Sequence, residues 1–307
     1  MSELEPPKIF KCQINHEGEK TELSCWTPAK EVAKAASVLI IHDIAETVNS
    51  YTSGIKSLID EGFKVYGFNL KCFNFDENIE RKDFPDNFKD FTVEILQVIA
   101  YIKHIEGGVP PFVLTQGLGS LVGLINTRKH ANFVRGFIAC SPMFQLSEKI
   151  IPLKRLTIKT LSDFTPNFVL PKKISPKFTS NRKAIVDGNA HKIEPKITAR
   201  EAYEYLKAMS QARKNFAKIS RPTLLVCPDH NAVHKYSFLK KSISKHKYED
   251  SIEFINLHTK YHAIASDRST VLETYEKYII PWLNSTLEKE LIPKVDEAPE
   301  TSERQGN

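Results

Sequence analysis

The stretch 112–124, FVLTQGLGSLVGL, places the strongest constraint on what this chain can fold into. Its first residues are uniformly apolar, which favours a buried strand. Gly117 and Gly119 then mark a tight turn, and residues 118–128 carry apolar side chains at helical spacing. A buried strand that passes through a glycine turn into a helix is typical of a parallel sheet with crossover helices.

The rest of the chain repeats this alternation of strands and helices. Two runs of period-two alternation, 8–15 and 21–26, flank the polar HEGEK segment and predict a β-hairpin. Further strands are predicted at 37–41, 63–69, 112–114, 133–140, 223–227 and 251–257, and further helices at 50–61, 88–104, 236–246 and 267–287. The predicted fold class is therefore α/β, with a mostly parallel central sheet, helices on both faces and an antiparallel hairpin at its start.

The alternation stops in the middle of the chain. Residues 145–218 contain several prolines, show a helical pattern only at 198–215, and hold 16 Lys and Arg against 6 Asp and Glu. Because the whole chain has a net charge of +6, the remainder is negative overall. We expect a core formed by residues 8–144 and 219–288, a basic lid insertion at 145–218, a flexible N-terminus at 1–7 and a disordered polar tail at 289–307.

The composition and the N-terminal residues predict the cellular location of the protein and the redox state of its cysteines. The 307 residues, 41% of them hydrophobic, suffice for a sizeable core, and no apolar run is long enough to cross a bilayer. Since the N-terminus also lacks the charged and apolar regions of a secretory signal, we expect a cytoplasmic protein. The five cysteines are scattered without a CxxC pair, which predicts reduced, mostly buried thiols.

Several short stretches carry a family resemblance that covers residues 8–286. They are VLIIH at 38–42, IDEGFKV at 59–65, ISPKFTS at 174–180 and KYHA at 260–263. With the order of elements, they resemble the α/β-hydrolases of the monoacylglycerol lipase, lysophospholipase and serine aminopeptidase-like group. The resemblance implies an α/β-hydrolase fold with a lid, a GxSxG turn that carries the serine nucleophile, an HG pair in the oxyanion loop, and an acid and a histidine that activate the serine.

The chain departs from that family pattern at the positions that do the chemistry. The GxSxG turn is replaced by TQGLG, so Gly117 stands where the nucleophile would be. Leu118 follows it, at the position whose backbone N–H faces the oxyanion in the family. A glycine readily adopts the positive φ of such a turn, so the turn can persist without its nucleophile. His42 and Asp43 replace the HG pair, and a carboxylate there would oppose a developing oxyanion.

The remaining two positions of the triad differ in how well they match. His262, in the loop after the last strand, stands where the family has its base. The acid position falls on Asn231, although a shorter loop would bring Asp229 into that role instead.

Other nucleophiles, metals and cofactors are less well supported. Structural roles are favoured for the hydroxyls and the thiol near the turn, at Thr115, Ser120, Cys140 and Ser141. Two histidine pairs have i, i+4 spacing, His230 with His234 and His258 with His262, but both lie in loop or strand segments. We therefore predict no metal site, and no cofactor, because glycine-rich phosphate loops are absent.

Three interpretations of the function remain open. The favoured interpretation is a non-catalytic α/β-hydrolase, a pseudoenzyme that binds a lipid-like or small acyl ligand or a protein partner. The alternative is an active carboxylic-ester hydrolase of the lysophospholipase type, with an unorthodox nucleophile and His262. A different chemistry on the same fold is a third, less favoured interpretation.

The basic lid is most simply a solvated face, with an anionic membrane surface or an acidic protein as candidate partners. Nucleic acid is not expected, because aromatic residues are not interleaved with the charges.

Overall fold

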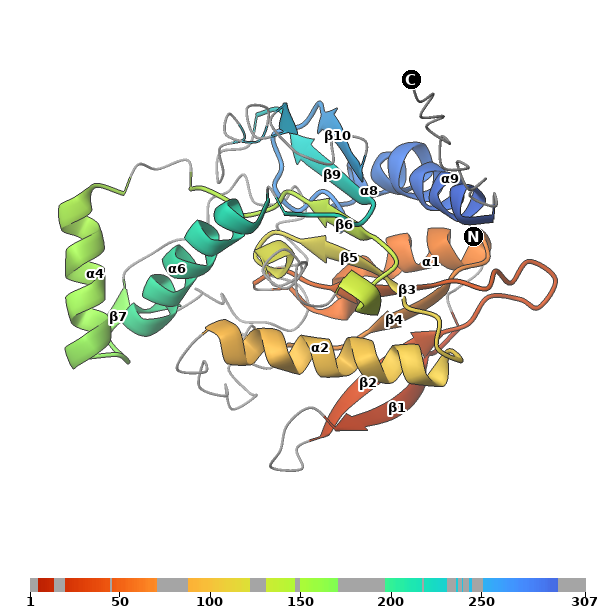
Figure 1. Ribbon diagram of the computed structural model, residues 1–307, viewed down its shortest axis with the longest axis horizontal. Coiled ribbons are helices and arrows are strands. Elements are labelled where there is room, and N and C mark those ends of the chain that lie inside the picture. Colours follow the sequence, from red (N-terminus) through yellow and green to blue (C-terminus); the bar gives the residue numbers. More distant parts are fainter. Residues whose placement is uncertain are drawn as a thin grey trace, which may run out of the picture.

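The computed structural model describes most of the α/β core and part of the lid insertion. The described residues are 5–13, 20–44, 46–70, 88–121, 131–146, 150–170, 197–216, 218–230, 251–291, and the positions 236, 239, 243 and 244. Figure 1 shows a central sheet with helices on both of its sides.

The central sheet confirms the predicted α/β class. Its eight strands are ordered β1-β2-β4-β3-β5-β6-β9-β10, and every pair from β4 to β10 is parallel. The hairpin β1–β2 and the pair β2–β4 are antiparallel. The strand bounds are β1 Lys8–Gln13, β2 Lys20–Trp26, β3 Ser37–Ile41, β4 Lys64–Gly67, β5 Phe112–Gln116, β6 Phe137–Cys140, β9 Thr223–Pro228 and β10 Ile252–Leu257.

Helices cover both faces of the sheet because its central strands are apolar on both sides. In β3, Val38 and Ile40 pack on one face, and Leu39 and Ile41 pack on the other, as the period-two geometry of a strand requires. The first face is covered by α1 (Thr52–Asp60), α8 (Val271–Glu273) and α9 (Ile280–Leu291). The second face is covered by α2 (Phe88–Ile105) and α6 (Ala199–Phe216).

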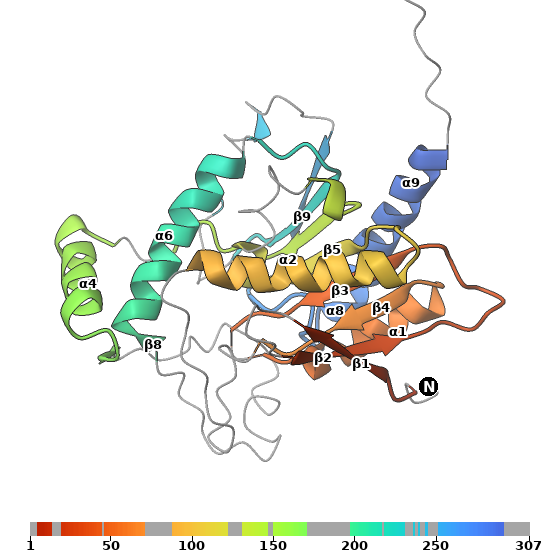
Figure 2. The ribbon, with the colours of Figure 1, turned by 60° about the horizontal axis from the view of Figure 1, so that its bottom comes forward.

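The described part of the insertion, which was expected as a lid at 145–218, contains one helix that the sequence pattern did not indicate. It is α4 (Pro152–Phe164), which begins with a proline in its first turn and packs against α6. The short strands β7 (Val169–Leu170) and β8 (Ile197–Thr198) pair between these two helices. Both views place α4 beyond α6, at the end of the molecule away from the sheet (Figures 1 and 2).

Element ends differ from the predictions by a few residues. The last helical segment runs from α8 through a π-helical turn, η5 (Thr274–Ile279), into α9, which ends at Leu291. The expected tail from residue 289 is therefore wrong by three residues, and residues 292–307 lie outside the described part. Most of the helix expected at 236–246, and Cys72, also lie outside it. The four described cysteines, Cys12, Cys25, Cys140 and Cys227, are buried, as predicted, and form no disulfide.

Among the helices in the described part of the chain, none combines the length and the hydropathy that crossing a bilayer requires.

Candidate functional site

The candidate site lies where loops leave the carboxyl ends of three parallel strands. Asp43 follows β3, Gly117 follows β5 directly, and His262 lies in the loop after β10. Because β3 and β5 are neighbours with Ile41 opposite Thr115, the residues that follow them leave the sheet side by side. This edge of a parallel sheet is where α/β proteins place their functional side chains.

The backbone of the turn at Gly117 has the conformation expected from the sequence. Gly117 has φ +52°, and its N–H donates to the carbonyl of Cys140 at 2.9 Å. A Cβ placed on Gly117 would lie 2.0 Å from Oδ2 and 2.3 Å from Cγ of Asp43. The Asp43 carboxylate therefore fills the space into which a side chain at position 117 would project.

The Asp43 carboxylate also accepts a hydrogen bond from the backbone N–H that follows Gly117. Oδ1 of Asp43 accepts from the backbone N–H of Leu118 at 2.8 Å and from that of Ile44 at 2.8 Å. Leu118 follows Gly117, and in the family pattern its N–H would face the oxyanion that forms during ester hydrolysis. A fixed negative charge on this donor occupies the position that a developing oxyanion needs.

The second oxygen of Asp43 contacts the retained histidine. Nε2 of His262 lies 3.0 Å from Oδ2 of Asp43, and both side chains are fully buried. Since a carboxylate oxygen can only accept, Nε2 of His262 must carry the proton in this contact. The general base of a serine hydrolase needs a free lone pair on that nitrogen. In this arrangement His262 is paired as a buried donor, which is unsuited to deprotonating a hydroxyl.

The loop that carries His262 is fixed to the sheet through its backbone. The carbonyl of His262 accepts from Oγ of Ser141 at 2.6 Å and from Nε2 of Gln116 at 2.9 Å. Gln116 also accepts the N–H of Ala265 through Oε1, at 3.3 Å. These bonds hold the loop against β5 and β6. The position of the loop, and with it the contact between the imidazole and Asp43, is therefore fixed.

His42 supports Asp43 from the preceding position. Its Nδ1 lies 2.7 Å from the carbonyl of Asp43, and its Nε2 accepts the N–H of Leu70 at 2.9 Å. These two bonds require the neutral ring with the proton on Nδ1. Burial lowers the pKa of His42 to about 4, which agrees with a neutral ring.

Glu46 adds a second buried carboxyl to the site. It accepts from the N–H of Asp43 at 3.1 Å, from the hydroxyl of Tyr51 at 2.5 Å and from the hydroxyl of Ser266 at 2.6 Å. Burial, and then the negative charge of Asp43, raise the pKa of Glu46 to about 7, although the three hydrogen bonds act in the opposite direction. Glu46 is thus partly protonated near neutral pH, which reduces repulsion between the two carboxyls.

The structure corrects one expectation about the acid of the triad. Asp229 does not face His262; its Oδ2 lies 2.5 Å from Nδ1 of His258 instead. The reason is the register of β9 and β10, which pairs Pro228 with Leu257 and so brings the next residues of both strands together. The preferred acid position, Asn231, lies outside the described residues.

The other candidate nucleophiles make structural contacts, as the sequence analysis favoured. The hydroxyl of Thr115 donates to the carbonyl of Ile138 at 3.1 Å and lies 3.0 Å from Oγ of Ser120. Burial raises the pKa of the Cys140 thiol and so disfavours its reactive thiolate. Ser141 is used to hold the loop of His262.

Asp43 and Glu46 form one buried network with His262, and the sequence pattern did not indicate this network. A signal was nevertheless present at two positions. The nucleophile position lost its side chain at Gly117, and the oxyanion loop gained one at Asp43. Positions 43 and 117 are expected to face each other in this family. A glycine at 117 together with an aspartate at 43 therefore indicates that the Asp43 side chain occupies the space of the absent serine side chain.

A mostly parallel sheet with a turn of this kind after β5 and a histidine loop after β10 defines an α/β-hydrolase. The family model of the serine aminopeptidases, S33, matches residues 33–269, and the chain belongs to this lipase- and esterase-like family. A monoglyceride lipase homolog of Monkeypox virus is 24% identical over 230 residues, which cover 74% of this chain and 81% of that protein.

Solved structures show the same fold. The monoacylglycerol lipase of Paleococcus ferrophilus superposes with a TM-score of 0.71 at 20% identity, covering 87% of this chain and 100% of that one. A soluble variant of the monoglyceride lipase of Saccharomyces cerevisiae, in complex with a substrate analog, gives a TM-score of 0.73 at 15% identity, covering 91% and 95%. The α/β-hydrolase fold implied by the sequence resemblance is thus confirmed.

Proposed function

We propose that this chain is a non-catalytic α/β-hydrolase that binds a lipid-like or acyl ligand, with its lid directed to an anionic membrane surface. The observation that carries the loss of catalysis is the position of the Asp43 carboxylate. It fills the space beside Gly117, accepts the N–H of Leu118 and pairs with Nε2 of His262. One side chain thereby occupies the sites of the nucleophile, the oxyanion and the proton acceptor.

An active ester hydrolase with an unorthodox nucleophile is the competing function. It requires a hydroxyl or thiol that can reach the imidazole of His262 and an oxyanion donor that is not already bonded to a carboxylate. Among the described residues, the hydroxyls of Ser120 and Ser141 bond to Thr115 and to the His262 carbonyl, not to the ring. These contacts favour the non-catalytic function.

A fluorophosphonate probe separates the two functions because it reacts with activated serines. We expect the purified wild-type chain to remain unlabelled, and to show no ester hydrolysis that depends on His262. The labelling reaction is run beside an active serine esterase and beside the His262→Ala variant. Labelling of the wild type that disappears in His262→Ala would contradict the proposal, and the labelled peptide would identify the nucleophile.

The lid carries the surface that supports a lipid partner. Among the described residues, six of the eleven exposed large hydrophobic side chains lie within 151–169. We call them the lid face: Ile151, Leu153, Leu156, Phe164, Phe168 and Val169. Lys154, Arg155 and Lys159 stand among them on α4. Apolar residues bordered by basic ones are the combination that binds an anionic membrane interface.

We expect the wild-type chain to co-sediment with vesicles that contain anionic lipid, and more weakly with neutral vesicles. Replacing Leu153, Leu156 and Phe164 together by Glu should lower vesicle binding by at least about tenfold, because burial of each side chain contributes roughly 1.5 to 3 kcal/mol. Leu272→Glu, which changes an exposed leucine on α8, is the matched control. Equal binding by the triple variant and the control would exclude the lid face as the membrane contact.

A further inference from the structure

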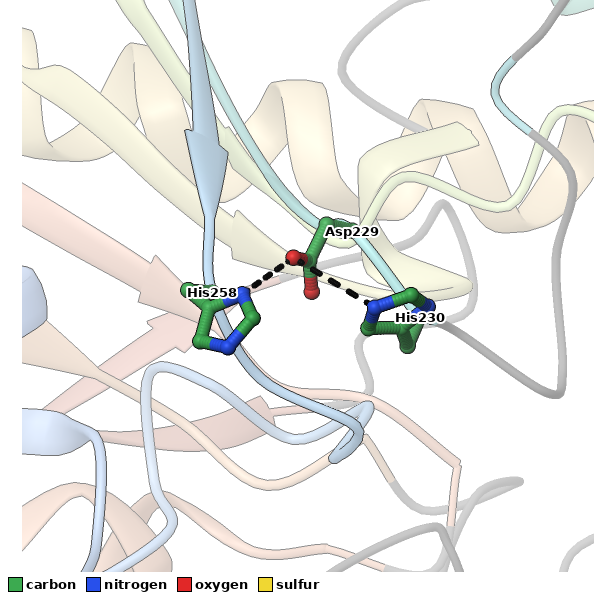
Figure 3. A group of neighbouring side chains, drawn as sticks. All are labelled: Asp229, His230 and His258. Atoms are coloured by element: carbon green, nitrogen blue, oxygen red, sulfur yellow. Dashed lines mark hydrogen bonds and ion pairs between the residues drawn. The ribbon is translucent and has the colours of Figure 1, made fainter.

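Asp229, His230 and His258 form a compact group of metal-binding side chains at the carboxyl ends of β9 and β10. Figure 3 shows the carboxylate of Asp229 between the two imidazoles, with an interaction drawn to each ring. One ligand atom from each residue lies within 4.8 Å of those from the other two. The group is separate from the pair of Asp43 and His262, since Asp229 faces His258.

The sheet register and the backbone fix the three residues relative to one another. Asp229 is the first residue after β9, and His258 is the first after β10. The N–H of Asp229 donates to the carbonyl of Leu257 at 2.9 Å, and the N–H of His230 donates to that of Thr259 at 3.3 Å. The ladder between the two strands thus continues past their ends, so the three side chains project from a rigid base.

The carboxylate is oriented by a bond on the side away from the imidazoles. Oδ1 of Asp229 accepts the N–H of Thr259 at 3.0 Å. Oδ2 is left to the two rings, 2.5 Å from Nδ1 of His258 and 3.8 Å from Nε2 of His230. A second partner that orients a ligand in this way is a common feature of metal sites.

Differences in exposure allow the group to close around an ion. The side chain of Asp229 is 19% exposed, whereas those of His230 and His258 are 74% and 90% exposed. Ligand atoms that share one zinc ion each lie about 2.0 to 2.2 Å from it, so they must come within roughly 4.4 Å of one another. The contact of 3.8 Å between His230 and Asp229 already lies within this limit, whereas the hydrogen bond of 2.5 Å between His258 and Asp229 must open to admit the ion. That movement falls on an exposed imidazole, which rotates at little cost.

We propose that Asp229, His230 and His258 bind a divalent transition-metal ion, with zinc as the ion to test. Two imidazole nitrogens and one carboxylate oxygen suit zinc and its first-row neighbours better than calcium or magnesium, which prefer oxygen ligands. Three protein ligands leave at least one coordination position for water or a further ligand. The bound ion would join the ends of β9 and β10 to the segment that leads to His262.

The charge state of the group favours binding. Burial acts to raise the pKa of Asp229, but the hydrogen bond from His258, the charges of both histidines and the N–H of Thr259 outweigh it, and the pKa is lowered. The carboxylate is therefore ionised at neutral pH, as a ligand must be. A neutral imidazole offers a nitrogen lone pair to a metal ion, so each ring can supply one ligand atom.

The site is tested by calorimetric titration of Zn²⁺ into chelator-treated, full-length protein without a histidine tag. At pH 7.5, His258→Ala and Asp229→Asn should each weaken the strongest binding event by at least about tenfold. Asp229→Asn keeps an oxygen that can accept the N–H of Thr259, so its fold is preserved. His104→Ala, at an exposed histidine on α2, is the matched control and should bind as the wild type does.

Two results would overturn the site. One is a wild type that binds no Zn²⁺ at pH 7.5. The other is a wild-type affinity that is unchanged in both His258→Ala and Asp229→Asn, which would assign the binding to other side chains among the ten histidines and five cysteines. Titration with Co²⁺ gives an independent readout. Its visible absorption band should appear with the wild type and with His104→Ala, and be lost in both site variants.

Discussion

Gly117→Ser alone should not restore reactivity toward a fluorophosphonate, whereas Asp43→Gly combined with Gly117→Ser should. The single variant places its Cβ 2.0 Å from the Asp43 carboxylate, so either the new side chain or Asp43 must be displaced. Removing the carboxylate clears that space, frees the N–H of Leu118 to face an oxyanion and releases Nε2 of His262. All three functions that one side chain blocks are then recovered together.

The expected rate of labelling depends on the acid position. The sequence pattern predicts Asn231 at the acid position, and replacing that acid by an amide costs up to about 10⁴-fold in a serine protease because the histidine tautomer is no longer held. We therefore expect slow labelling of the double variant and an increase of several orders of magnitude when Asn231→Asp is added. An oxyanion donor contributes roughly 10² to 10³ in rate, so Asp43→Gly should raise the labelling rate of the Gly117→Ser variant by at least about this factor.

The matched control for this series is Asp43→Gly with Gly117→Ala, which clears the same space and supplies no hydroxyl. It should remain unlabelled while keeping the thermal stability of the serine double variant. Labelling of Gly117→Ser by itself would show that Asp43 is not the obstacle. Failure of the folded triple variant to label would show that the site has lost more than the groups replaced.

The fold could be predicted because the spacing of apolar residues differs between strands and helices. The strand at 112–116 is buried throughout, and its first three residues form a continuous apolar run. The helix α4 cannot be assigned from the sequence because its apolar residues do not coincide with its buried ones. Leu153 and Leu156 are exposed, and only Ile158 and Ser162 are buried in that helix. An apolar pattern that faces outward cannot be assigned by the rule that places apolar residues inside.

The site was predictable in its residue types and less so in its contacts. The glycine at position 117, the aspartate at 43 and the histidine at 262 all follow from the sequence pattern. The contact between Asp43 and His262 joins residues 219 positions apart, and it depends on how far two loops extend beyond the sheet. Asp229 shows the same limit, because whether it faces His258 or His262 depends on the register of β9 against β10.

His262→Ala should destabilise the protein strongly, by about 3 to 5 kcal/mol in the free energy of unfolding. The substitution leaves the buried carboxylate of Asp43 without the hydrogen bond from Nε2 of His262, and the loss of this partner by a buried carboxylate is the larger part of the cost. His258→Ala removes a partner of Asp229 from the surface, where the side chain is 90% exposed, and should change stability by less than about 1 kcal/mol. Urea denaturation in the presence of a chelator measures both.

A double-mutant cycle separates the lost contact with the Asp43 carboxylate from the cavity that His262→Ala creates. Asp43→Asn keeps an oxygen for the N–H groups of Leu118 and Ile44 but carries no charge, so His262→Ala in that background leaves no unpaired carboxylate. The cavity is the same in both backgrounds and cancels. We expect His262→Ala to cost at least about 1 to 2 kcal/mol less in the Asp43→Asn background than in the wild-type background. Equal costs would mean that the pair contributes nothing beyond packing, and His262 would then be explained by shape alone.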